Sequence, residues 1–135
     1  MKRIFLDTNF VIDYFVREGY MGNAEKVLQL GSRLGFRFCI SYLTIANFAY
    51  ILRKENKETL HSLVERICNV FEIINNDKSQ IEQSLKLSCD DFEDGLQIAA
   101  AVDGGCDCII TRNTRDFAAS IIPVFTPGEF VERFE

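Results

Sequence analysis

Residues 4–13 read IFLDTNFVID, an apolar run that ends on Asp7 and is followed by a second apolar run up to Asp13. The first run is typical of a short buried strand, and the second predicts a helix over residues 9–17 with apolar side chains along one side. A carboxylate directly after a buried strand needs a partner, because a buried unpaired charge costs several kcal/mol or becomes protonated. We therefore expect Asp7 either to cap the next helix or to bind a ligand.

The same alternation of strand and helix patterns continues along the chain. Further strands are expected at residues 36–41, 70–74, 106–111 and 122–125. Further helices are expected at residues 23–35 (capped by Asn23 and ended by Gly35), 42–54, 57–69, 78–88, 91–102 and 126–134 (capped by Thr126). Tight hairpin turns are missing between the strands, which favours right-handed crossovers and a parallel sheet. The sequence therefore predicts an α/β sandwich.

Length and composition limit the functional classes. The 135 residues suit one domain, 1–135, with no repeat or linker that would divide it. The five cysteines are an odd number and lie partly in apolar runs, which indicates thiols in a reducing, cytoplasmic compartment. The N-terminal residues form neither a signal peptide nor a membrane span. A net charge of -5 argues against a protein that binds nucleic acid over its whole surface.

Acidic side chains far apart in the sequence should meet in such a fold. The carboxyl ends of parallel strands share one edge of the sheet, and the helices that lead down into the next strands begin at that edge. Asp7 is expected at this edge because it follows the first strand. The start of the helix at 91–102 should bring Asp90, Asp91 and Asp94 there, and the segment after the strand at 106–111 should bring Asn113 and Asp116. The sequence therefore predicts a cluster of carboxylates there.

Such a cluster favours a hard cation. Two like charges about 4 Å apart cost on the order of 4 kcal/mol at an effective dielectric constant near 20, and Mg²⁺ or Mn²⁺ would remove that repulsion. Structural roles remain open for each acid. Asp91 or Asp94 could place charge at a helix N-terminus, and Asp116 could follow a cap at Asn113. Asp13 is expected to be solvated or a cap, as is Asp90.

Other catalytic chemistries have little support. His61 is the only histidine and is expected on a polar helix flank, which disfavours histidine-dependent triads and histidine-ligated zinc. Cys106 and Cys108 form one short thiol pair without a second pair to complete a zinc site. Glycine-rich phosphate-binding motifs do not occur in the sequence.

Three motifs, taken in order, resemble a known family. LDTNFVID at residues 6–13, DFEDGLQIAAA at 91–101 and IITRNTRDF at 109–117 are similar to those of PIN-domain ribonucleases, including VapC-like toxins of toxin-antitoxin pairs. The resemblance implies a three-layer α/β/α sandwich with a mainly parallel sheet. It also implies catalytic, metal-binding acids at Asp7, Asp94 and Asp116, with Mg²⁺ or Mn²⁺ as cofactor.

The resemblance extends to supporting residues and partners. It gives supporting roles to Thr8, Asn9, Thr111 and Asn113, and a further supporting role to Asp91. Arg112 and Arg115 flank Asn113 and are candidate phosphate contacts, although exposed arginines are common on any surface. The implied partners are an RNA substrate, a protein antitoxin and, in some cases, a second copy of the chain.

One position departs from the family pattern. The family usually carries a glutamate on the helix after the second strand, and the matching stretch LTIANFAYIL has Asn47 at that place. An asparagine can offer a carbonyl oxygen or a hydrogen bond but brings no charge. With three acids, we expect weaker cation binding than with four.

The function indicated is a metal-dependent endoribonuclease that hydrolyses RNA phosphodiester bonds, the toxin of a toxin-antitoxin pair. The first alternative is a catalytically weakened PIN-like module that binds RNA or a protein. The second alternative is a phosphoacceptor signalling domain, which also has aspartates at the edge of a parallel sheet. Such a domain typically has a lysine near the site after the last strand. The stretch IPVFTPGEF at residues 122–130 contains none.

Overall fold

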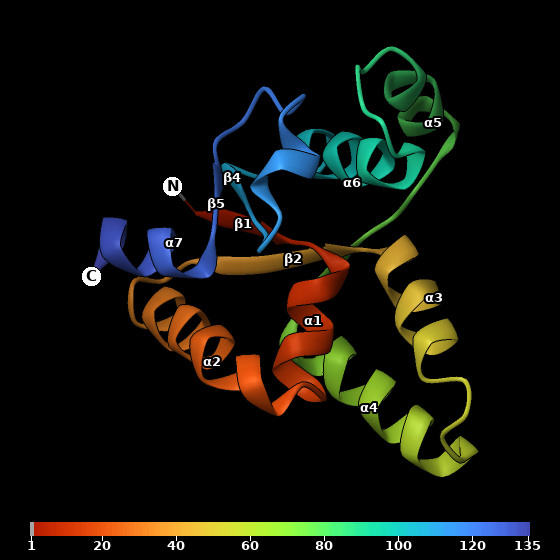
Figure 1. The fold of residues 1–135 in the computed structure, drawn as a ribbon, viewed down its shortest axis with the longest axis vertical. Coiled ribbons are helices and arrows are strands. Elements are labelled where there is room, and N and C mark those ends of the chain that lie inside the picture. Colours follow the sequence, from red (N-terminus) through yellow and green to blue (C-terminus); the bar gives the residue numbers. More distant parts are fainter. Residues whose placement is uncertain (1) are drawn as a thin grey trace.

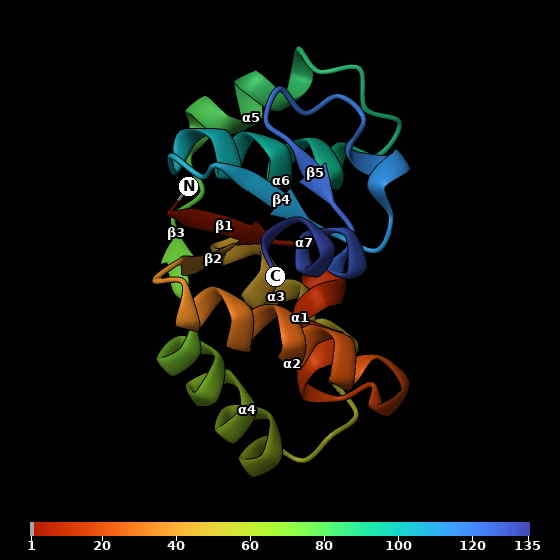
Figure 2. The ribbon, with the colours of Figure 1, turned by 90° about the vertical axis from the view of Figure 1, so that its left-hand side faces the viewer.

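The computed structural model describes residues 2–135 and shows one parallel sheet with helices on both of its faces (Figures 1 and 2). The strands are β1 (Arg3–Leu6), β2 (Arg37–Ser41), β3 (Glu72–Ile74), β4 (Cys108–Ile110) and β5 (Val124–Phe125). The helices are α1 (Thr8–Phe15), α2 (Glu18–Arg33), α3 (Tyr42–Ile51), α4 (Lys57–Val70), α5 (Lys78–Leu85), α6 (Phe92–Asp103) and α7 (Pro127–Phe134), with a 3₁₀ turn, η1 (Thr114–Phe117). The predicted three-layer α/β/α sandwich is confirmed.

Strand β1 lies at the centre of the sheet. The strand order is β3-β2-β1-β4-β5, and all neighbouring pairs are parallel. Ile4, Phe5 and Leu6 are completely buried because helices cover both faces of the strand and other strands cover both of its edges. A continuous apolar run is what a strand in that position requires. Its end, where Asp7 follows, consequently lies in the middle of the carboxyl edge of the sheet.

The side chains of β1 alternate between two cores. Ile4 and Leu6 belong to the larger core, which includes apolar residues of α1, α2, α3, α4 and α7. Phe5 belongs to the smaller core, built with α6 and η1 through Ile98 and Phe117. In Figure 2 the layer of α5 and α6 lies on the opposite side of the sheet from α1, α2 and α4. The site residues carried by α1 and α6 therefore reach the same edge from opposite layers.

Polar caps mark the points where strands turn into helices. The Asp7 side chain caps α1, and Ser41, the last residue of β2, caps α3 directly. Thr126 and Glu129 form the predicted capping box at the start of α7. These caps begin α1 and α3 at the carboxyl edge with almost no intervening loop.

The start of α2 differs from the prediction. Asn23 was expected to cap this helix, but α2 begins at Glu18 and Asn23 lies inside it. The chain turns earlier because the carbonyl of Arg17 accepts hydrogen bonds from the backbone N–H groups of Tyr20 and Met21. The end of the helix matches the prediction, since Gly35 follows with a φ of 78°, a left-handed conformation that glycine adopts readily. Asn23 is thereby available to another part of the molecule.

Candidate metal centre and neighbouring pocket

Asp7 is buried at the carboxyl end of β1, and only 5% of it is exposed. One carboxylate oxygen accepts a hydrogen bond of 2.9 Å from the backbone N–H of Phe10, and the other accepts one of 2.6 Å from Thr111 Oγ1. The capping role left open by the sequence is thus present. The second bond ties the end of β1 to the residue after β4, so the side chain is held in a single orientation.

The environment of Asp7 favours its protonated form. Burial raises the pKa of Asp7 to about 6, although the hydrogen bonds from Thr111 and Phe10 act in the opposite direction. The charge of Asp13 raises the pKa further, while Arg112 lowers it. A carboxylate kept partly neutral by burial would gain from a cation that stabilises its charged form.

Other acids reach the same region from α6 and η1. Asp91 caps α6 and accepts a 2.8 Å hydrogen bond from the backbone N–H of Glu93. Its charge therefore lies at a helix N-terminus, which is the structural role that the sequence left open for it. Burial raises the pKa of Asp94 to about 7, and repulsion from Asp91, Asp116 and other acids including Asp7 adds to the effect. The structure therefore brings Asp7, Asp94 and Asp116 into one electrostatic cluster.

A hollow of about 310 Å³ opens beside this cluster. Its lining residues are Ser88, Cys89, Asp90, Asp91, Asp94, Arg115, Asp116, Ala118 and Ala119. Asp90 is exposed, as expected, and Arg115 is an exposed cation among the acids. The hollow is large enough to admit a solvated cation or a phosphate group to the cluster.

The donor atoms of the cluster suit a hard cation. All of them are carboxylate oxygens, the ligand type that Mg²⁺ and Mn²⁺ prefer. The pKa values of Asp7 and Asp94 are raised first by burial and then by neighbouring acids, and a cation would favour the charged form of both side chains. Within residues 2–135, however, no three acid, histidine or cysteine side chains lie close enough together to hold one ion. The donor chemistry fits, while the side chains are spread more widely than around a bound cation.

A pair of residues joins α3 to α6 at this edge. Asn47 Nδ2 donates a hydrogen bond of 2.6 Å to Glu93 Oε1. Burial raises the pKa of Glu93, with a further contribution from Asp91, and the hydrogen bond from Asn47 opposes the change. Glu93 in turn raises the pKa of Asp94, which places its charge near the cluster. Our reading of the sequence did not include Glu93, although it directly precedes Asp94 in the first turn of α6.

A buried polar network beneath the acids was also missed. Gln97 accepts a hydrogen bond of 2.6 Å from Ser41 Oγ and donates bonds of 3.1 and 3.0 Å to Thr8 Oγ1 and Thr44 Oγ1. Thr8 and Thr44 are themselves 3.2 Å apart, oxygen to oxygen. The network connects the starts of α1 and α3 to α6, so it fixes the spacing of the elements that carry Asp7, Asn47 and Asp94. The sequence signal for this network was the presence of polar residues at the starts of helices that follow parallel strands.

Asp13 is not solvated, and that expectation was wrong. Only 3% of Asp13 is exposed, and its carboxylate accepts hydrogen bonds from Arg112 Nε at 2.6 Å, from Arg112 Nη2 at 3.2 Å and from Arg17 Nη1 at 3.1 Å. Position 13 is on the inward side of α1, where the neighbouring segment after β4 supplies the counter-charge. Arg112 is consequently held in an ion pair instead of extending freely towards a substrate.

The remaining predicted residues lie around the cluster. Asn9 Oδ1 accepts a hydrogen bond of 3.3 Å from Arg17 Nη1. Thr111 Oγ1, which donates to Asp7, accepts a bond of 3.0 Å from the backbone N–H of Asn113. The Asn113 side chain is exposed at the edge. These contacts support the shape of the edge, and their part in a reaction stays a prediction.

Comparison with known proteins agrees with this architecture. The family model of the PIN domain matches residues 3–115. The chain belongs to the PIN-domain family. This PIN domain is 30% identical to Ribonuclease VapC1 of Aquifex aeolicus (strain VF5) over 142 aligned positions, which cover 98% of the chain and 96% of the relative.

Solved structures resemble this PIN domain over most of its length. A toxin-antitoxin complex from Klebsiella pneumoniae contains a chain with a TM-score of 0.69 and 26% identity, covering 92% of this chain and 97% of the other. A chain of VapBC2 from Rickettsia felis, bound to a DNA fragment from its promoter, gives a TM-score of 0.69 at 17% identity. The alignment covers 90% of this chain and 96% of the other. The second likeness concerns the fold alone.

Proposed function

We propose that this PIN domain, residues 1–135, is a divalent-cation-dependent endoribonuclease and the toxin of a toxin-antitoxin pair. The observation that carries the proposal is that Asp7 and Asp116, from two other elements, both raise the pKa of Asp94 on α6, so that the three acids influence one another at the carboxyl edge of the sheet. The relative named as a ribonuclease aligns with nearly the whole chain, which supports the same chemistry here. The reaction class is hydrolysis of RNA phosphodiester bonds.

Asp7, Asp94 and Asp116 would hold Mg²⁺ or Mn²⁺. Such a cation activates water and offsets negative charge that develops at phosphorus. Glu93, held by Asn47, would add a fourth carboxylate from α6 in place of the acid that α3 lacks. Thr111 and the backbone N–H of Phe10 orient Asp7 by their two hydrogen bonds. Supporting roles fall to Thr8, Asn9, Asp91 and Asn113, and phosphate contacts to Arg115 and, where its ion pair allows, Arg112.

The test is cleavage of a labelled single-stranded RNA by the purified chain with Mg²⁺, with Mn²⁺ and with a chelator. We expect cleavage with a cation, none in chelator, and loss of cleavage in Asp94→Asn. The control is Glu82→Gln, which removes one exposed acid from α5 and should cut at the wild-type rate. Specific RNA binding without cleavage under any of these conditions would favour the weakened PIN-like module instead.

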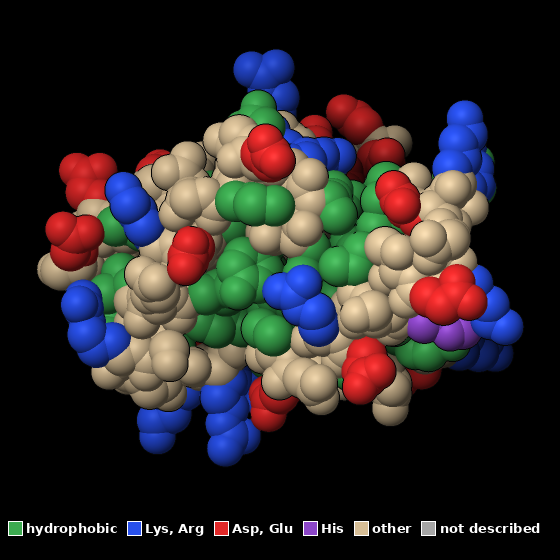
Figure 3. Space-filling view, turned by 90° about the horizontal axis from the view of Figure 1, so that it is seen from below, with side chains coloured by type: hydrophobic (Ala, Val, Ile, Leu, Met, Phe, Trp, Pro, Cys, Tyr) green, Lys and Arg blue, Asp and Glu red, His purple; other side chains and the backbone are tan. Residues whose placement is uncertain are grey.

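We also propose a protein antitoxin as partner, acting in the cytoplasm. Two structural neighbours come from complexes that are described as toxin-antitoxin or VapBC assemblies. Apolar side chains gather in a hollow on the face formed by α1, α2 and α4 (Figure 3). A depression of about 550 Å³ lies between α1 and α2, and its lining residues are Tyr14, Glu25, Leu28, Gln29, Ser32 and Arg33. Within residues 2–135, no helix is long and apolar enough to cross a membrane.

This surface is tested by Leu28→Lys, which puts a charge into the depression. We expect the variant to lose binding to the proposed antitoxin while it stays folded and keeps RNA cleavage, with a somewhat lower melting temperature because Leu28 packs against the larger core. The control Lys26→Ala changes an exposed side chain of the same helix and should keep the complex. A complex that survives Leu28→Lys would place the antitoxin elsewhere.

A further inference from the structure

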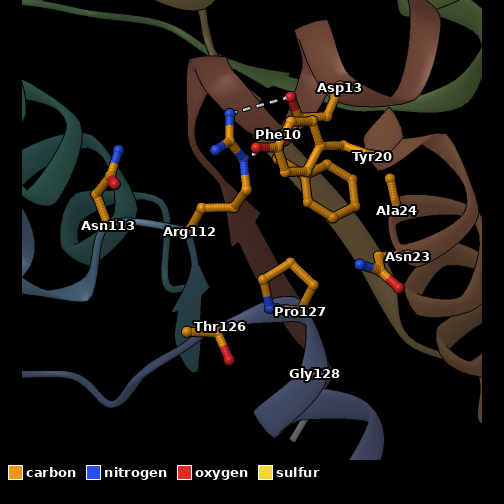
Figure 4. A pocket seen from close by; sticks show the side chains of 10 residues that line it. All are labelled: Phe10, Asp13, Tyr20, Asn23, Ala24, Arg112, Asn113, Thr126, Pro127 and Gly128. Carbon is orange, nitrogen blue, oxygen red and sulfur yellow. Dashed lines mark hydrogen bonds and ion pairs between the residues drawn. The ribbon is translucent and has the colours of Figure 1, made fainter. Parts of the chain in front are cut away.

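A second cavity is lined in part by Arg112 and Asn113, which belong to the segment after β4 (Figure 4). Its volume is about 340 Å³, at the lower end of the range of about 300 to 1,000 Å³ for small-ligand sites. The residues that line it come from α1, α2, α7 and the segment after β4: Phe10, Asp13, Tyr20, Asn23, Ala24, Arg112, Asn113, Thr126, Pro127 and Gly128. The acidic cluster and this cavity therefore share a wall made by the segment after β4.

Flat and hydrogen-bonding groups alternate around the cavity. The guanidinium carbon of Arg112 lies 3.9 Å from the centre of the Tyr20 ring, so the two groups stack. Figure 4 shows the Arg112–Asp13 pair at one end, Pro127 and Gly128 of α7 at the other, and the amide of Asn23 between them. An amide both donates and accepts hydrogen bonds, as the edge of a nucleobase does.

The charge inside the cavity is largely balanced. Among the residues that line it, Arg112 carries one positive charge and Asp13 one negative charge, and the Asp13 carboxylate accepts two hydrogen bonds from Arg112. A site for a phosphate group would be expected to offer uncompensated cations. This arrangement suits a flat, uncharged and polar ligand better than an anion.

Position relates the cavity to the proposed reaction. Arg112 and Asn113 directly follow Thr111, whose hydroxyl donates to Asp7. The backbone N–H of Asn113 donates to the same hydroxyl, so the cavity wall is connected to the acid by two hydrogen bonds. Two residues of the cavity wall, Arg112 and Asn113, are therefore adjacent in the chain to the residue that orients Asp7.

We propose that this cavity binds one nucleobase of the RNA next to the cleaved bond and thereby selects the cleavage position. Tyr20 and Arg112 provide stacking surface, and Asn23 and Asn113 read the hydrogen-bonding edge of the base. A peptide side chain is the less suitable occupant, because an apolar one would leave these amides without partners. The proposal rests on the proposed function, since it names the part of the RNA that the protein recognises.

The first experiment measures binding without catalysis. The wild-type protein in chelator is titrated with each of the four nucleoside 5′-monophosphates and with ribose 5-phosphate, and the side-chain amide signals of Asn23 and Asn113 are followed by NMR. We expect at least one nucleotide to shift the Asn23 signal saturably, while ribose 5-phosphate does not. If ribose 5-phosphate shifts it equally, or only a purified antitoxin does, the cavity is not a base site and the proposal fails.

The second experiment uses variants that lie outside the acidic cluster. Asn23→Ala should reduce the affinity for the preferred nucleotide about tenfold, which is the effect of losing about one hydrogen bond. Tyr20→Ala should weaken the binding of all four nucleotides. Asn69→Ala and Tyr50→Ala are matched controls, because Asn69 is an exposed helical asparagine and Tyr50 is an exposed tyrosine that also carries an arginine over its ring. Unchanged affinity in both cavity variants would overturn the proposal.

Cleavage of a randomised RNA pool completes the test. We expect Asn23→Ala to flatten the base preference beside the cut while the controls keep the wild-type preference. An unaltered preference would contradict the proposal even if the pool is cleaved. If nucleotides bind at Asn23 and no RNA is cleaved with any cation, the proposed ribonuclease activity fails while the base site stands, so the two failures can be told apart.

Discussion

Asn47 and Glu93 form a 2.6 Å hydrogen bond that links α3 to the first turn of α6. The two residues lie on helices that begin at the same edge of the sheet but belong to different parts of the chain. The bond places a carboxylate from α6 opposite the position where α3 carries an uncharged amide. In the proposed site, this bond would let Glu93 supply the carboxylate that α3 lacks.

Asn47→Glu should lower the stability of the protein without divalent cations and increase its stabilisation by them. In chelator the new carboxylate faces Glu93 and should lower the melting temperature, because like charges repel. Mn²⁺ should then raise the melting temperature more than in the wild type, since binding to the folded state stabilises it by RT ln(1 + [L]/Kd). Melting curves and calorimetric titration of Mn²⁺ measure both effects.

Tyr50→Glu is the control for added charge on α3, because Tyr50 is exposed. It should show no increase in Mn²⁺ affinity. If Asn47→Glu binds Mn²⁺ no more tightly than the wild type, residue 47 does not face the cation and the role given to Glu93 loses its support.

Asp7→Asn should change the pH dependence of stability without unfolding the protein. The pKa of Asp7 is about 6 in the folded state, compared with an ordinary value of 3.8, so the folded state binds the extra proton between these pH values. Stability of the wild type in chelator should therefore fall as the pH rises from about 4 to 6, by about 3 kcal/mol at most from this group. Asparagine retains the helix cap but does not titrate, so its urea-unfolding free energy should vary less.

Asp7→Asn should also abolish cation-dependent RNA cleavage, as should Asp94→Asn. Asp7→Ala separates the capping role of Asp7 from its catalytic role, because alanine removes the helix cap as well. It should lower the free energy of unfolding by a further amount of roughly 0.5 to 2 kcal/mol. If Asp7→Asn unfolds the protein, the carboxylate is needed for the fold. If both asparagine variants cleave RNA normally with Mg²⁺, the assignment of the acids is wrong.

Asp13→Ala should be one of the most destabilising substitutions of an acid. It leaves Arg112 and Arg17 without their buried counter-charge, which we expect to cost about 3 kcal/mol. The value is at the low end of the usual range because the two arginine side chains are 30% and 37% exposed. Glu72→Gln is the control, since it breaks a more exposed pair with Arg3 and should cost under about 1 kcal/mol by urea unfolding.

Arg115 and Arg112 should affect RNA binding differently. Arg115 is exposed beside the acids, so Arg115→Ala should weaken binding and reduce the slope of log affinity against log salt by about 0.7, as for one phosphate contact on a single strand. Arg112→Ala should leave this salt slope unchanged, because its guanidinium is bound to Asp13, and should lower stability as well as base binding. Fluorescence anisotropy across a salt series distinguishes them. Equal slopes for Arg115→Ala and the wild type would remove Arg115 from the contact.

The fold was predictable because its signals are local. The continuous apolar run of β1, the cap and proline at the start of α7 and the glycine after α2 each depend on a few neighbouring residues. The start of α2 was not predictable in this way, because it depends on how the chain leaves α1 at Arg17. Topology then brought Asp7, Asp94 and Asp116 to one edge without any information on side-chain contacts.

The partners of individual side chains were harder to predict. Asp13 meets Arg112 from a segment 99 residues away, and a periodicity argument on α1 alone cannot supply that contact. Gln97 likewise resembles an ordinary polar helix residue until α1 and α3 are placed beside it. Glu93 escaped attention for the same reason, since its significance comes from Asn47 on another helix.

The hydrogen bond from Thr111 to Asp7 connects residues 104 positions apart, and β4 is added beside β1, a strand that is synthesised well before it. Synthesis proceeds from the N-terminus, so β1, α1 and α2 emerge well before the segment that completes the acidic edge. Contacts of such long sequence separation also form late, because the intervening loop must first be closed. A nascent or prematurely terminated chain that lacks β4 would therefore have no assembled site. An enzyme that cuts RNA would remain harmless to its own message until translation has passed β4 and η1.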